Sequence, residues 1–153
     1  MTFTKYLKSI NACSGAVEWA ENKTIEEVVA TCHRGDWLLW LAYKCDIGLQ
    51  PLTLAKGHCA NTVRHLMKND RSIKAVDTAI AFGEGRATRE ELDAAYDAAR
   101  AAAYAAAYDA AHAAAYAAAA AYARDANRLQ TADICRKYIG DLIIQKVNSI
   151  LNP

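Results

Sequence analysis

The chain has 153 residues, a formal net charge of +1 and five cysteines. This length fits one domain that buries its own core. The small net charge argues against a generally acidic or basic partner, so we do not expect nucleic acid binding. Residues 1–8 lack the uninterrupted apolar run of a signal peptide. No segment has the hydrophobicity of a membrane span over about 18 residues. We therefore expect a cytoplasmic protein with no membrane partner.

Hydrophobic spacing predicts helices along the whole chain, and no segment has the period-2 alternation of a strand. We therefore predict an all-α fold, and the short connections indicate antiparallel neighbours in one bundle. It is a single-domain helical bundle of about six or seven helices, with one long Ala/Tyr-rich helix. The sequence leaves open whether the last two helices are continuous or bent between them. After a short lead-in segment at 5–10, the expected helices are 12–21, 25–34, 37–45, 52–67, 72–82, about 88–127 and about 131–151.

Two capping boxes mark expected helix starts. In each, a threonine oxygen and a glutamate carboxylate three residues later can satisfy free backbone N–H groups. Thr24 pairs in this way with Glu27, and Thr88 with Glu91. The last helix is expected to present one apolar face, because hydrophobic residues recur along it at i, i+3/i+4 spacing. These are Ile134, Cys135, Ile139, Leu142, Ile143, Val147 and Ile150.

Residues 94–126 are mostly alanine, the strongest helix former, interrupted mainly by tyrosine. At 100° per residue, one side of this helix carries only small residues, while Tyr104, Tyr108 and Tyr116 drift around the other side. Two interpretations stay open. The alanine side can pack closely on a neighbour, with the rings as scaffold. Alternatively, Tyr104, Tyr108 and Tyr116 form an exposed stripe that binds a partner, since tyrosine is enriched at interfaces.

The densest motif is Arg-Gly-Asp-Trp-Leu-Leu-Trp-Leu-Ala at residues 34–42. We expect Gly35 to end the preceding helix as its C-cap. Asp36 is expected to cap the following helix and to pair with Arg34. Trp37 and Trp40 are three residues apart, so both rings should face one direction. The motif is either a capped core helix or an aromatic anchor beside a charged pair, and the second interpretation makes Arg34, Asp36 and Trp37 candidate binding residues.

The sequence contains no motif for catalysis, for a cofactor or for a metal. The four histidines are scattered, and the five cysteines lack the spacing of a zinc site or a disulfide framework. We therefore expect no enzyme activity, no cofactor, no metal, and reduced cysteines that are mostly buried. A basic stretch over 56–74 is interpreted as a solvated helix face.

Three features together resemble an immunity protein family of bacterial polymorphic toxin systems. The first is Ala-Cys at 12–13 with Trp-Ala at 19–20. The second runs from the capping box at 24–27 through residues 34–42. The third is the entry at 85–92 into the Ala/Tyr helix, which ends in Ala-Asp-Ile-Cys-Arg at 132–136. The resemblance covers roughly residues 11–138.

The resemblance implies a cytosolic helical protein that binds a cognate protein toxin and neutralises it by occlusion, without turnover. The family supplies no binding residues, so the candidates remain those chosen by residue type: Tyr104, Tyr108, Tyr116, Arg34, Asp36 and Trp37. The alternative is a structural or self-associating helical scaffold without a toxin partner, in which the alanine side forms a homo-oligomer.

Overall fold

The computed structural model describes the backbone of residues 1–110 and 117–153, and the side chains of residues 1–100 and 126–153. The predicted all-α fold is confirmed: the described residues form eight α-helices and one 3₁₀ helix, and no strand. The helices are α1 (Phe3–Ser9), α2 (Ser14–Trp19), α3 (Ile25–Thr31), α4 (Gly35–Lys44), α5 (Leu49–Asn61), the 3₁₀ helix η1 (Arg64–Leu66), α6 (Asp70–Gly83), α7 (Arg89–Ala110) and α8 (Ala117–Leu151).

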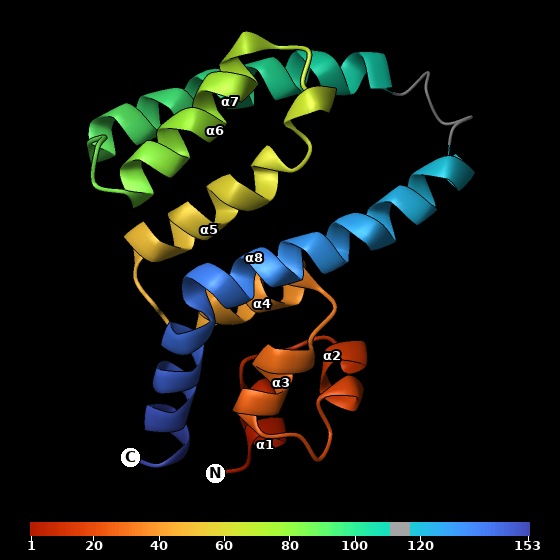
Figure 1. Cartoon of the computed structure of the whole chain (residues 1–153), viewed down its shortest axis with the longest axis vertical. Coiled ribbons are helices and arrows are strands. Elements are labelled where there is room, and N and C mark those ends of the chain that lie inside the picture. Colours follow the sequence, from red (N-terminus) through yellow and green to blue (C-terminus); the bar gives the residue numbers. More distant parts are fainter. Residues whose placement is uncertain (111–116) are drawn as a thin grey trace.

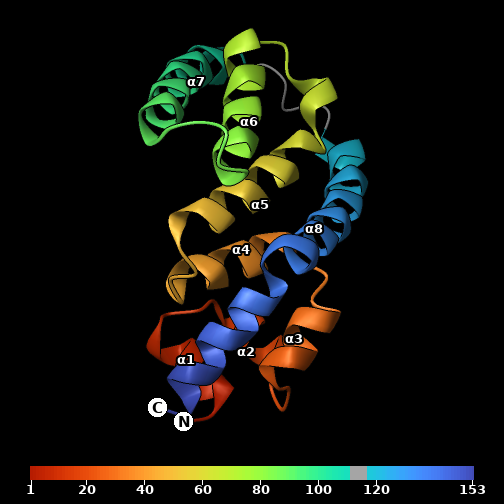
Figure 2. The ribbon, with the colours of Figure 1, turned by 60° about the vertical axis from the view of Figure 1, so that its left-hand side comes forward.

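The helices pack around α8, the longest of them, which crosses the molecule in Figure 1. Helices α3, α4 and α5 pack on α8, and α4 also contacts α5. Helix α6 then covers α5, and α7 covers α6, so that α5, α6 and α7 follow one another away from α8 (Figure 2). The two termini meet at the opposite end, where the amino group of Met1 donates to the carbonyl of Leu151 at 3.0 Å.

One face of α8 forms the centre of the core. Cys135, Ile139, Ile143 and Val147 follow one another at i+4 spacing, and each has at most 1 % of its surface exposed. This spacing places them on one side of the helix, as predicted. They belong to a single apolar cluster with residues of α3 and α4, among them Leu38.

Both predicted capping boxes are present. Glu27 donates its N–H to the hydroxyl of Thr24 at 3.2 Å, and its carboxylate accepts from the N–H of Thr24 at 2.8 Å. Thr88 and Glu91 repeat the pattern at the same two distances. These reciprocal bonds begin α3 and α7 at the residues that the sequence indicated.

The capping roles predicted for Gly35 and Asp36 are wrong. Helix α3 ends at Thr31 with Cys32 as its C-cap, and Gly35 is the first residue of α4. Asp36 lies within the first turn of α4, and no side chain caps this helix start. A glycine is needed at position 35 because of a tertiary contact: Gly35 lies directly against Thr131 of α8, and there is no room for a side chain between them.

Other boundaries also differ from the prediction. Residues 127–131, which include neither glycine nor proline, lie inside α8, so the helix is continuous at this point. The helix expected over 88–127 includes residues 111–116, which lie outside the described residues; the structure describes α7 up to Ala110 and α8 from Ala117. The two helices have different neighbours, α7 packing on α6 and α8 on α3, α4 and α5. The helix expected over 52–67 is shorter and ends at Asn61.

Candidate functional site

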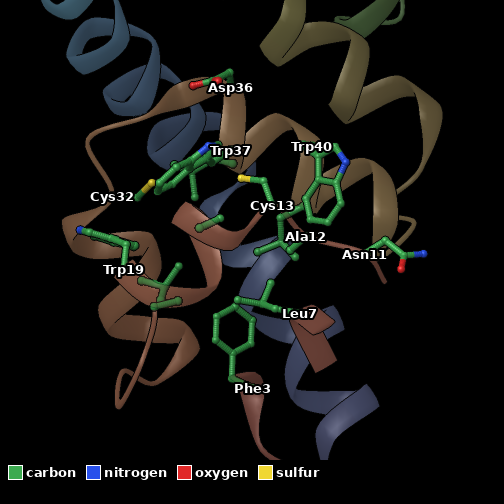
Figure 3. A pocket seen from close by; sticks show the side chains of 15 residues that line it. Phe3, Leu7, Asn11, Ala12, Cys13, Trp19, Cys32, Asp36, Trp37 and Trp40 are labelled. Atoms are coloured by element: carbon green, nitrogen blue, oxygen red, sulfur yellow. The ribbon is translucent and has the colours of Figure 1, made fainter. Parts of the chain in front are cut away.

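An apolar cavity of about 330 Å³ opens where α1, α2 and α4 meet (Figure 3). All three tryptophans of the chain line it: Trp19 at the end of α2, and Trp37 and Trp40 on α4. Phe3 and Leu7 contribute from α1. Preformed, mostly apolar hollows with a few polar groups at the edge are the usual form of binding sites. This cavity is therefore our candidate functional site.

The tryptophans reach the cavity because of their helical spacing. Trp37 and Trp40 are three residues apart on α4, and this spacing lets both line the cavity. Trp19 arrives from α2, and its ring lies 6.1 Å from that of Trp37. His33, in the connection between α3 and α4, lies 5.8 Å from Trp19 and 6.1 Å from Trp37. Aromatic pairs at such distances attract each other beyond their area burial.

Each tryptophan also carries a cation over its ring. The Lys23 ammonium lies 4.6 Å from the ring centre of Trp19, and the Arg34 guanidinium lies 4.6 Å from that of Trp37. Lys44 lies 5.7 Å from Trp40. Cation–π contacts of this kind contribute about 0.5–1 kcal/mol each at exposed sites. Each tryptophan that lines the cavity thus has a positive charge over its ring.

Arg34 and Asp36 form the predicted ion pair at the rim of the cavity. The guanidinium donates to the two carboxylate oxygens at 3.0 and 2.5 Å, a bidentate arrangement. The hydrogen bond from Arg34 lowers the pKa of Asp36, and the same bond raises the pKa of Arg34. The side chain of Asp36 is 55 % exposed, so the pair contributes little to stability. Its effect is to orient the guanidinium that lies over Trp37.

The structure brings together half of the binding residues predicted from the sequence. Arg34, Asp36 and Trp37 meet at the cavity. The side chains of the tyrosine stripe lie outside the described residues, so its role stays a prediction for Tyr104, Tyr108 and Tyr116.

Sequence reasoning missed Lys23, His33 and the contact of Trp19 with Trp37. No local pattern could have predicted that contact, because the two tryptophans are 18 positions apart and α3 lies between them in the sequence.

The basic stretch over 56–74 is partly neutralised. Arg64 forms a bidentate pair with Asp77 of α6, one bond of which measures 2.9 Å. His58 stacks on the ring of Tyr138, with the centres 4.3 Å apart and the planes 7° from parallel. The other basic side chains are exposed, as expected of a solvated helix face: Lys56, His65, Lys68, Arg71 and Lys74.

Comparison of the chain with known protein families, with curated proteins and with solved structures finds no match. Within the described part of the chain, no three His, Cys, Asp or Glu side chains lie together as metal ligands would. The described helices include none with both the length and the apolar character needed to cross a membrane.

Proposed function

We propose that the chain is an immunity protein that binds a cognate bacterial toxin and neutralises it by occlusion, without catalysis. The observation that carries this proposal is the cavity lined by Trp19, Trp37 and Trp40, with a cation over each ring. It supports the proposal because tryptophan and arginine are the residue types that dominate binding energy at protein interfaces.

The geometry suits a protein partner. A hollow of about 330 Å³ can receive an apolar side chain that projects from the partner surface. Around it, Lys23 and Lys44 supply positive charge, which favours a partner with carboxylates at the corresponding positions. Because Trp19 and Trp37 contact each other, the binding surface is preorganised, which reduces the entropy lost on association.

Two titratable groups that line the cavity, Asp36 and Cys32, favour binding over acid–base chemistry. The pKa of Asp36 is lowered by its bond to Arg34, and burial raises the pKa of Cys32. Both shifts move the pKa further from pH 7, whereas a general acid or base works best when its pKa lies near the working pH.

A growth experiment tests the proposal. Each gene that neighbours this one in its genome is induced alone in a host, and those whose product arrests growth are induced again with the wild-type chain. We expect the chain to restore growth against one such product. In a purified assay, inhibition should be complete at one copy of the chain per toxin molecule.

Two outcomes would contradict this function. One is the absence of rescue against every growth-arresting neighbour. The other is complete inactivation of the toxin by far less than one equivalent of the chain, which would indicate turnover rather than occlusion. The Tyr43→Ala variant provides a folded control, because Tyr43 is an exposed aromatic residue of α4 that does not line the cavity.

A further inference from the structure

Two thiols face each other where α5 packs on α8. The sulfur atoms of Cys59 and Cys135 lie 3.9 Å apart. Cys59 has 9 % of its surface exposed and Cys135 none. Each thiol also contacts a backbone carbonyl, Cys59 that of Thr131 at 3.7 Å and Cys135 that of Gly35 at 3.6 Å. The two sulfurs thus occupy the point where α4, α5 and α8 come together.

The other cysteines, all within the described residues, have different surroundings. Cys32 donates to the carbonyl of Arg34 at 3.4 Å, and Cys45 to that of Ala42 at 3.6 Å. Burial raises the pKa of Cys45 to about 11, which keeps it protonated. Cys13 is exposed. Only the thiols of Cys59 and Cys135 contact each other.

We propose that Cys59 and Cys135 are a thiol oxidation site, at which hydrogen peroxide converts the two thiols into a disulfide that joins α5 to α8. The bond requires a sulfur separation of about 2.05 Å, so the sulfur atoms must approach each other by about 2 Å. Side-chain rotation together with a small shift of α5 along α8 can supply this movement. No chain segment has to unfold for the two sulfurs to meet.

The reaction begins at Cys59, because it is the more exposed of the two thiols and Cys135 is fully buried. The hydrogen bond between the two sulfur atoms acts in the same direction, since it lowers the pKa of Cys59 and raises that of Cys135. The Cys59 thiolate attacks one peroxide oxygen, the O–O bond breaks, and the released hydroxide takes up the Cys59 proton as water. The Cys135 sulfur then attacks the Cys59 sulfenic acid and loses its proton, and the sulfenic oxygen leaves as a second water. Two thiols and one peroxide thus give one disulfide and two waters.

The disulfide would fasten together two parts of the fold. Cys59 and Cys135 are 76 positions apart in the sequence, so the bond closes a long loop of the unfolded chain. Bonds that close long loops stabilise by restricting the unfolded state. We expect the Tm of the oxidised protein to be roughly 5–10 °C above that of the reduced protein.

The test is to treat the folded full-length protein with hydrogen peroxide, remove the peroxide, and alkylate the remaining thiols in denaturant. Two of the five thiols should become unreactive and should return after reduction. Trypsin should release one joined product containing residues 57–64 and 129–136, which hold Cys59 and Cys135. The Cys59→Ser and Cys135→Ser variants should give no joined product. The Cys45→Ser variant should give it in the wild-type amount.

The proposal is overturned if the oxidised wild-type protein keeps both thiols free. It is equally overturned if either cysteine is found joined to Cys32, or if Cys59 carries oxygen without a cross-link. Because the disulfide is measured in the wild-type protein itself, poor folding of a serine variant does not affect the outcome of the test. A Cys32→Ser variant that still forms the joined product would show that Cys32 takes no part.

Discussion

Replacing Gly35 by alanine is expected to lower the free energy of unfolding by roughly 3 kcal/mol. A Cβ atom at this position would lie 2.5 Å from the carbonyl carbon of Thr131 and 2.6 Å from its Cβ. These atoms belong to the middle of α8, and backbone atoms cannot move aside as the end of a flexible side chain can. Overpacking of a tight contact costs about 1–3 kcal/mol, and we expect this one at the upper end. Urea unfolding followed by circular dichroism measures the change.

Gly15 provides the matched control. It lies in α2, and a Cβ added there would have no atom within 4 Å. Because alanine is favoured over glycine in helices by about 0.5–1 kcal/mol, Gly15→Ala should leave stability unchanged or raise it slightly. Equal effects of the two substitutions would show that α4 does not approach α8 as closely as described.

Truncation of Ile143 to alanine is expected to cost about 4 kcal/mol. Ile143 is fully buried on the inner face of α8, within the cluster that includes α3 and α4. Replacing a large aliphatic core residue by alanine costs about 2–5 kcal/mol, because the lost transfer free energy adds to that of the cavity left behind. We expect a loss in the upper half of this range, because α3 and α4 pack against this face of α8 and prevent the space left by the side chain from collapsing.

Leu129→Ala is the corresponding control on the same helix. Leu129 is 53 % exposed, so its truncation should change the free energy of unfolding by no more than about 0.5 kcal/mol. Differential scanning calorimetry of both variants measures the effects. A loss for Ile143→Ala as small as that for Leu129→Ala would place the inner face of α8 outside the core.

Local signals in the sequence were sufficient for the helices and for part of the core. The capping boxes at Thr24 and Thr88 predicted the starts of α3 and α7, because their bonds involve only residues of the same turn. The i+4 spacing of Ile139, Ile143 and Val147 predicted the buried face of α8, since helix geometry alone places them on one side.

Features that depend on distant contacts could not be predicted in this way. Gly35 resembles a helix end in the sequence, but its role is to let α4 approach Thr131, which lies 96 positions further along the chain. The candidate site shows the same division. The spacing of Trp37 and Trp40 predicted that they share a face of α4. The position of Trp19 beside Trp37 depends instead on how α2 packs beside α4.

The tryptophan cavity is the surface that we propose binds the toxin. The most direct test of this role is the affinity of the wild-type and Trp37→Ala chains for the toxin identified by growth rescue, measured by titration calorimetry. Circular dichroism confirms that each variant remains helical. Tyr43→Ala serves as the control, and the triple replacement of Tyr104, Tyr108 and Tyr116 by alanine represents the competing surface.

Removal of an anchoring tryptophan costs at least about 2 kcal/mol at a hot spot, so Trp37→Ala should weaken binding by about 30-fold or more. Tyr43→Ala should bind like the wild-type chain. Wild-type affinity in a folded Trp37→Ala chain, together with loss of binding in the triple tyrosine variant, would contradict this role of the cavity and place the interface on the tyrosine stripe.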